Sequence, residues 1–322
     1  MNVRKLGFLV LFLALASSAW AVAPPGMPNG WSDGFVYANG IRIHYYHAVP
    51  APGKPVIVMV HGVTDIGLSW ATLAEELQKS YDIYMPDSRG HGLSDPFTDA
   101  DNGVTLIKDV VGFVRAMKFK KPILLGHSMG AATVMRVGAE YPDLPRAVIM
   151  LDPLLGPWPP NFHERGMPQA GHGSQGAAAA GAASAKDIPV SMFGPPQELV
   201  AQNNYSYDDL LAKCRRENPK WDIVDCQYWA LSKKQYHGPY SMAQRQAMTG
   251  TMRTGDALAR IRVPALILKA DAPPAVRKAT EQIAKVMQHG KLVYIDGAGH
   301  NLHHDQRKRT VQELTAFLNT LH

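Results

Sequence analysis

The sequence is poor in cysteine, with only two in 322 residues, and its glycines and prolines follow no fixed period. So few cysteines exclude a disulfide scaffold, the class of small protein in which many bridges replace a core. The 28 glycines and 24 prolines show no collagen-like repeat. Hydrophobic residues make up 46% of the chain, which excludes an intrinsically disordered protein. We therefore expect a globular protein with a large hydrophobic core.

The chain also lacks a hydrophobic run long enough to cross a membrane. Its first apolar run, residues 6 to about 16, is shorter than the ~20 residues that a span needs. Two basic residues precede this run and small residues follow it, which is typical of a secretory signal peptide. We expect residues 1–23 to be this signal, with cleavage near Ala21 or Ala23. The mature protein would then be periplasmic or secreted, with no stable membrane anchor.

Large blocks of one charge are absent as well. The 33 Lys and Arg residues exceed the 27 Asp and Glu residues by little, and the one basic cluster is Arg307-Lys308-Arg309. Such a balance does not suggest a nucleic-acid partner. The partner that we expect is a small-molecule substrate.

Export would change the interpretation of Cys214 and Cys226. In an oxidising compartment two cysteines so close in sequence can form one bridge, whereas in the cytosol they would be free thiols. Closing so short a loop would stabilise the region by roughly 3 kcal/mol on the chain-entropy model. Two buried free thiols are the alternative.

From Phe35 onward, short β-rich runs alternate with helical patterns, which predicts an α/β fold with a mostly parallel sheet and helices on both faces. The expected strands are 41–48, 56–60, 82–85, 122–125, 147–151, 265–269 and 291–295. The expected helices are 69–79, 105–117, 129–141, 276–288 and about 305–321.

The alternation stops between residues 153 and 263, which we interpret as a cap inserted into one core formed by 24–152 and 264–322. Within the insertion, 11 of the 16 residues of 171–186 are Gly or Ala, which predicts a loop. The later part has a mostly helical pattern and is rich in aromatic residues and methionine. We expect these side chains to form the core of a helical cap, with some facing a pocket. They are Tyr205, Tyr207, Trp221, Tyr228, Trp229, Tyr236, Tyr240, Met242, Met248 and Met252.

The string Gly126-His127-Ser128-Met129-Gly130 lies between an expected strand and an expected helix. A Gly-x-Ser-x-Gly string in this context predicts a tight turn that exposes a nucleophilic serine at a helix N-terminus. An ordinary helix-capping serine would explain neither glycine. Ser128 is therefore the candidate nucleophile.

A serine hydroxyl needs a base to accept its proton, and His300 follows the last expected strand, where a loop can reach Ser128. His303 and His304 are competitors, but they lie where the last helix begins, and we expect them to be surface or loop residues. The group His300, His303, His304 and Asp305 could also suggest a metal site. No second ligand group in a matching context supports it, so we expect neither a metal nor an organic cofactor.

Four motifs in order resemble the α/β-hydrolase family: His61-Gly62-Val63 after a strand, the stretch 87–94 (DSRGHGLS), the serine turn, and Gly299-His300. The resemblance covers essentially the whole mature chain. It implies an oxyanion hole formed by the backbone N–H groups of Val63 and Met129. It also implies that Asp87, Arg89 and His91 are architectural residues.

The acid of the expected triad has two candidates. Most members of the family place it after the strand corresponding to 265–269, in a form like Gly-x-x-Asp, but here Ala270 replaces the glycine and Asp271 lies two positions early. Asp152 ends an earlier strand, where one subgroup of haloalkane dehalogenases and some lactone hydrolases place their acid. Either choice preserves the order Ser, acid, His. Asp152 could instead cap the loop before Pro153.

These residues predict a serine hydrolase that cleaves an ester, lactone or amide bond of a small, apolar or aromatic substrate through an acyl-enzyme. Dehalogenases and epoxide hydrolases of this family carry an aspartate at the turn, so Ser128 argues against both. A cofactor-free perhydrolase or carbon–carbon bond hydrolase would use the same triad and is the alternative. A non-catalytic binding protein on a hydrolase scaffold is the remote alternative.

Overall fold

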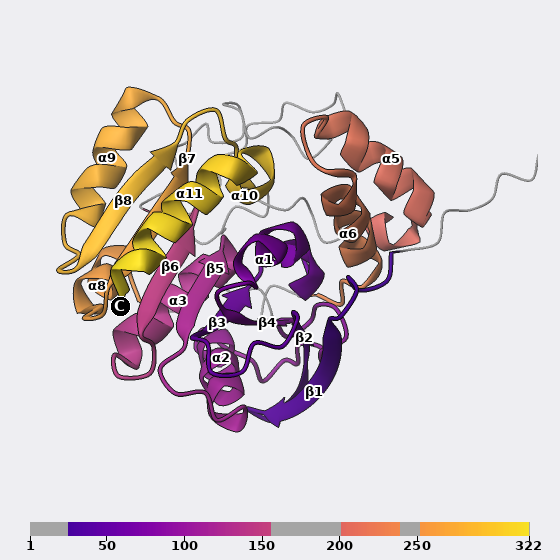
Figure 1. The fold of residues 1–322 in the computed structure, drawn as a ribbon, viewed down its shortest axis with the longest axis horizontal. Helices are drawn as coiled ribbons and strands as arrows, with labels where there is room; N and C mark the ends of the chain where they lie inside the picture. The colour runs from indigo at the N-terminus through magenta and orange to yellow at the C-terminus, as the bar shows by residue number, and fades with distance from the viewer. Residues whose placement is uncertain (1–24, 156–200, 239–251, 322) are drawn as a thin grey trace, which may run out of the picture.

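The computed structural model describes residues 25–155, 201–238 and 252–321 (Figure 1). The expected signal peptide, the Gly/Ala-rich loop and three of the aromatic and methionine residues (Tyr240, Met242 and Met248) lie outside these residues. Within the described ranges, no helix has both the length and the apolar character required to cross a membrane.

An eight-stranded sheet forms the centre of the molecule, with the strand order β1-β2-β4-β3-β5-β6-β7-β8. The pairs β1/β2 and β2/β4 are antiparallel, and all other neighbours are parallel. The strands are β1 (Ser32–Ala38), β2 (Ile41–His47), β3 (Val56–Val60), β4 (Asp82–Pro86), β5 (Ile123–His127), β6 (Ala147–Leu151), β7 (Ala265–Ala270) and β8 (Gly290–Ile295). The mostly parallel sheet confirms the predicted fold class.

Helices cover both faces of this sheet (Figure 1). One face packs against η1 (Gly67–Trp70), α1 (Ala71–Leu77) and α11 (Arg307–Leu318), and the other against α2 (Thr105–Ala116) and α3 (Met129–Glu140). Alternate residues of β3 go to opposite faces: Ile57 and Met59 join the first core, and Val58 and Val60 the second. A parallel strand buried on both faces requires a continuous apolar run, which VIVMV supplies.

The predicted elements agree with the observed ones apart from their ends. The helix expected at 276–288 is α9 (Pro274–Ala284), which begins with a proline in its first turn. The expected terminal helix is divided at Gln306, whose φ of −136° is not helical, into α10 (Leu302–Asp305) and α11; η3 (Asn319–Leu321) follows. The edge strand β1 was not expected as a separate strand.

The described part of the cap contains α5 (Tyr207–Glu217) and α6 (Ile223–Lys234). Ser206 and Asp222 cap the two N-termini by accepting the N–H groups of Asp209 and Val224. A disulfide between Cys214 and Cys226 joins the helices, with a Cα–Cα distance of 5.5 Å. The predicted bridge is therefore present.

The helix α8 (Thr254–Arg260) follows the cap helices in the chain but packs against α3. Ala257 and Leu258 are fully buried in the same core as the β3 residues Val58 and Val60. The hydroxyl of Thr254 donates to the carbonyl of Leu154 over 3.4 Å. The end of the region predicted as an insertion thus returns to the main domain, close to where the region begins.

Candidate active site

Ser128 lies on a strained turn between β5 and α3. Its φ of +52° and ψ of −113° are unfavourable for a residue with a side chain and cost on the order of 1–3 kcal/mol. The turn is possible because the residues two positions before and two positions after Ser128 are glycines. A Cβ at Gly126 would lie 2.3 Å from the carbonyl oxygen of Gly130, and one at Gly130 would lie 2.0 Å from that of Val60. The sequence motif therefore has a steric cause.

Asp152 and His300 come together beside this turn. His300 Nδ1 lies 2.5 Å from Asp152 Oδ2, and the Asp152 side chain is largely buried. Two hydrogen bonds to backbone carbonyls relate the pair to the Ser128 turn. The Ser128 N–H donates to the carbonyl of Leu151, the residue before Asp152, and His127 Nε2, from the residue before Ser128, donates to the carbonyl of His300. His300 is thus paired with one of the two candidate acids, and both residues lie on segments that are hydrogen-bonded to the Ser128 turn.

Asp271, the other candidate acid, has different partners. Its carboxylate accepts from Arg277 over 2.5 Å and from the N–H of Gly297 over 2.9 Å. These hydrogen bonds, first from Gly297 and then from Arg277, lower the pKa of Asp271. The side chain is 44% exposed, and its hydrogen bonds link the loops that follow β7 and β8. Of the two aspartates, only Asp152 is paired with His300.

Lys269, which was not singled out in the sequence, is a second partner of Asp152. Its ammonium forms an ion pair with Asp152 Oδ1 and donates to the carbonyl of Pro153 over 2.9 Å. Burial alone would raise the pKa of Asp152, but the Lys269 charge and the hydrogen bond to His300 outweigh burial and hold that pKa well below its usual range. A lysine at the end of the buried run ALILKA was the signal available in the sequence.

Two buried histidines hold the loop that carries Val63. His61 Nε2 accepts the N–H of Ser88 over 2.9 Å, and His91 Nε2 accepts the N–H of Thr64 over 3.2 Å. An imidazole nitrogen that accepts carries no proton, so both rings are neutral in this arrangement. Burial lowers the pKa of each ring, in agreement with the neutral form.

Val63 and Met129, whose N–H groups are the predicted oxyanion donors, are both buried in a small apolar cluster. Phe97, Leu106 and Tyr236 complete it. Tyr236 follows the cap helix α6 and is the aromatic residue of the described cap that packs in this cluster. Other cap aromatics have other contacts: Tyr228 donates to the carbonyl of Gly26, Trp221 donates to Asp305, and Tyr205 is 49% exposed.

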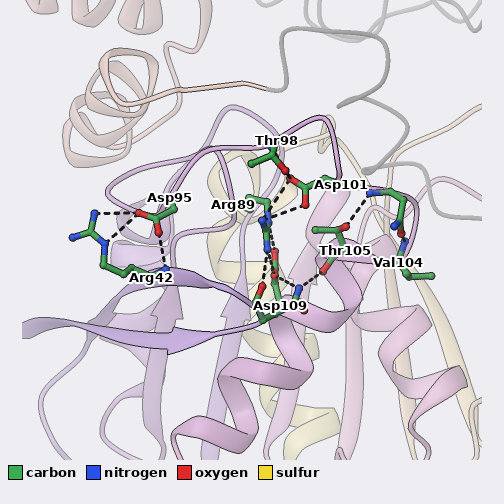
Figure 2. A network of polar contacts seen from close by, with 10 residues as sticks. Arg42, Arg89, Asp95, Thr98, Asp101, Val104, Thr105 and Asp109 are labelled. Carbon is green, nitrogen blue, oxygen red and sulfur yellow. Dashed lines mark hydrogen bonds and ion pairs between the residues drawn. The ribbon is translucent and has the colours of Figure 1, made fainter.

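The stretch 87–94 has the architectural contacts that the resemblance implies. Figure 2 shows Arg89 between Asp109 and Asp101, with Nε and one terminal nitrogen donating to Asp109 over 3.0 and 2.8 Å. Arg89 lies 3.2 Å from Asp101 Oδ1, and Asp101 also accepts the N–H of Thr98. Asp87 accepts the N–H groups of Gly67 and Leu93. These side chains fix the turn between β4 and α2.

The expectation that His303 and His304 are surface or loop residues was wrong. Both lie on α10, and their side chains are almost completely buried. The ring of His303 contacts the rings of His127, Trp70 and His304, with centroids 4.7, 4.8 and 4.1 Å apart. The short helix turns inward because Leu302, its first residue, is fully buried in the core. Burial, then His304 and His127, lower the pKa of His303 well below its usual value.

In the described residues, no three His, Cys, Asp or Glu side chains are arranged to hold a metal ion. Asp305, the carboxylate of the possible metal group, accepts the N–H of Gly299 over 2.8 Å and the indole N–H of Trp221 over 2.6 Å. Both carboxylate oxygens thus have protein donors.

A mostly parallel sheet with helices on both faces, a strained serine turn after β5 and a histidine after the last strand together define an α/β hydrolase. Residues 57–313 match the model of the alpha/beta hydrolase family. The chain therefore belongs to this family.

Individual relatives cover parts of the chain. N-formylmaleamate deformylase of Pseudomonas putida is 39% identical over 129 residues, which are 39% of this chain and 47% of that enzyme, less than half of its length. Among solved structures, E-2-(acetamidomethylene)succinate hydrolase is similar with a TM-score of 0.64 and 19% identity, over 90% of this chain and 99% of that one. The enol-lactonase of Burkholderia xenovorans has a TM-score of 0.60 and 18% identity, over 89% of this chain and 100% of that one. At such identities the structural likeness concerns the fold.

Proposed function

We propose that this protein is a serine hydrolase that cleaves an ester, lactone or amide bond of a small substrate through an acyl-enzyme. The observation that carries the proposal is the hydrogen bond of His300 to Asp152 beside the strained Ser128 turn. Strain of this kind is typical of functional sites, because it persists only where the surroundings enforce it.

In this mechanism His300 accepts the proton of Ser128 while the serine attacks the carbonyl carbon. Asp152 orients His300 through Nδ1, so that the other ring nitrogen is free to accept the proton, and it stabilises the imidazolium that follows. The N–H groups of Val63 and Met129 bind the developing oxyanion. Water then attacks the acyl-enzyme, with His300 again as the base, and releases the acid.

The substrate class is supported by two features. Tyr236, Phe97 and Leu106 pack beside Val63 and Met129, which favours an apolar or aromatic group next to the scissile bond. The names of the similar proteins include an N-formyl compound, an acetamido compound and an enol lactone. We therefore include amides and lactones with simple esters as candidate substrates.

The experiment that tests this function combines a fluorophosphonate probe with a panel of chromogenic esters, lactones and amides. The wild type should be labelled once per chain and should hydrolyse at least one member of the panel. Ser128→Ala should lose both reactions, whereas the control Ser80→Ala, at an exposed site after α1, should retain both. Labelling or hydrolysis that persists in Ser128→Ala would contradict the mechanism.

We also propose that the protein is exported and then processed, on the basis of the charged and apolar pattern of residues 1–23. The mature chain would begin at Val22 or Pro24. The intact mass of the protein recovered from the periplasm or medium tests this, and a full-length mass in that fraction would contradict it.

A further inference from the structure

Lys233 belongs to the cap helix α6, yet its side chain lies beneath the cap against the loop that follows β3. The residue is 4% exposed. Its ammonium donates to Oγ1 of Thr64 over 2.7 Å and to the carbonyl oxygen of Thr64 over 3.0 Å. It also lies 3.8 Å from Asp65 Oδ1. A lysine is almost never buried unless it is paired, so these contacts account for its position.

Thr64, the residue that Lys233 contacts, has an unusual backbone conformation. Its φ of +64° is in the left-handed region, which a β-branched residue rarely adopts. A conformation of this kind is retained only where several contacts enforce it. Here His91 accepts the Thr64 N–H, and Lys233 donates to the carbonyl and the hydroxyl of the same residue.

The geometry of Thr64 matters because Val63 precedes it directly. Rotation about the backbone of Thr64 would alter the loop of residues 61–65, whose Val63 N–H is the proposed oxyanion donor. An oxyanion hole is effective only when its donors are already in place before charge develops. Lys233 is the cap residue whose side chain holds the carbonyl and the hydroxyl of Thr64.

We propose that Lys233 is a positioning residue, through which the cap fixes the oxyanion loop in its catalytic conformation. This inference rests on the proposed serine hydrolase function. It adds that the cap is part of the catalytic apparatus as well as a cover for the substrate.

The positive charge of Lys233 would also help to stabilise the developing oxyanion. The ionisable groups that face the ammonium are Asp65 and His61 on the β3 loop and His91 on the turn after β4, and the ring of Trp229 lies 4.8 Å away. Burial lowers the pKa of Lys233 to about 8, against the attraction of Asp65. The histidines are neutral, so the ammonium is a positive charge beside the oxyanion loop. It is lost in mildly alkaline solution.

The test compares wild type, Lys233→Met and Lys233→Arg, with Lys234→Met as the matched control. Lys234 is the next residue on the same helix, but it is exposed and donates to carbonyls of Asn203 and Tyr205 within the cap. The measurements are kcat and KM for the best substrate of the panel from pH 6 to 10, together with the thermal unfolding midpoint.

In Lys233→Met we expect kcat to fall about 10- to 100-fold at pH 7 with KM within about threefold, less than the loss caused by removing an oxyanion donor outright. The kcat of the wild type should decline with a midpoint near pH 8 as Lys233 loses its proton. Lys233→Arg should keep part of the activity and lose the decline, because arginine stays charged. Lys234→Met should match the wild type in both respects.

Two results would overturn the inference alone: an unchanged kcat in Lys233→Met, or a rise in KM without a change in kcat. If Lys233→Met does not fold, Lys233→Gln takes its place in the same test, and a wild-type kcat that stays level to pH 10 would show that the charge of Lys233 does not contribute. A wild type that is neither labelled by the fluorophosphonate nor active would overturn the proposed function, and this inference with it.

Discussion

Asp225 Oδ1 on the cap helix α6 lies 3.2 Å from Nδ1 of His304 on α10. The same oxygen accepts the hydroxyl of Thr72 on α1 over 2.6 Å, and the aspartate side chain is only 3% exposed. From His304, ring contacts through His303 and His127 lead to His300, with centroid distances of 4.1, 4.7 and 4.7 Å. Asp225, which links the cap to the main domain, therefore lies at one end of a row of imidazoles whose other end is His300 of the candidate active site.

Asp225→Asn should lower the free energy of unfolding by about 2 kcal/mol at pH 7, because a buried carboxylate with charged and hydroxyl partners is replaced. Burial raises the pKa of Asp225, but His304, Thr72 and Arg307 outweigh it, and the net shift is downward. A lowered pKa stabilises the fold above the unfolded pKa of about 3.9, and this contribution disappears as the pH falls through the folded pKa. Urea unfolding at pH 7 and pH 3 should show a smaller difference between wild type and variant in acid. A constant or larger difference would contradict this.

Asp152→Asn and Asp271→Asn should differ strongly in their effect on turnover. Asp152→Asn removes the partner that orients His300 and should lower kcat by about 10⁴-fold, by analogy with protease triads. Asp271→Asn changes a half-exposed contact with Arg277 and Gly297 and should leave kcat within about threefold. Steady-state kinetics on the best substrate measure both. Similar losses in the two variants would mean that Asp152 is not the acid.

Gly130→Ala should prevent folding or lower the free energy of unfolding by more than about 3 kcal/mol. The new methyl group would lie 2.0 Å from the carbonyl oxygen of Val60 and 2.6 Å from that of His61, so β3 and α3 would have to separate. Gly255→Ala on α8 is the matched control, since no atom lies within 4 Å of its added Cβ. The control should gain about 0.4–1 kcal/mol. Urea unfolding of both purified variants tests the pair, and equal stabilities would refute the steric argument.

The Cys214–Cys226 bridge should stabilise the cap by roughly 3 kcal/mol, the chain-entropy value for a loop of this length. A Cys214→Ala/Cys226→Ala double variant should unfold its cap more readily, which hydrogen exchange of α5 and α6 would report. In the denatured, unreduced wild type, neither cysteine should react with a thiol-alkylating reagent. Two modified thiols under those conditions would show that the protein lacks the bridge.

The main features of the fold could be predicted because they have local causes. A short, β-branched apolar run such as VIVMV favours a strand buried on both faces, and Gly126 and Gly130 mark a turn that no larger residue permits. The strand β1 was harder to predict because it lies at the sheet edge. Its alternating half-exposed pattern includes Phe35 and Tyr37, which are 52% and 70% exposed.

The site was predictable in its motifs and not in its tertiary contacts. Ser128 and His300 belong to local patterns, whereas the choice between Asp152 and Asp271 depended on where the end of β6 meets the loop after β8. The contacts of Lys233 and Asp225 could not be predicted from the sequence for a similar reason. Their partners, Thr64 and His304, are far away in sequence, and a charged residue on a helix ordinarily indicates a solvent-exposed face.

The hydrogen bond between Thr254 and Leu154 means that the polypeptide leaves the main domain after β6 and returns to it, at the start of α8, at nearly the same point. An inserted segment whose two ends lie close together can be lengthened, shortened or exchanged with little effect on the sheet. The reason is that the entropy cost of closing a loop grows only slowly with its length. The cap can therefore change while the arrangement of Asp152, His300 and the Ser128 turn stays constant. If Lys233 positions the oxyanion loop as proposed, a cap exchanged between relatives also needs a cationic side chain that contacts Thr64. A chimera without this side chain should bind its substrate but turn it over slowly.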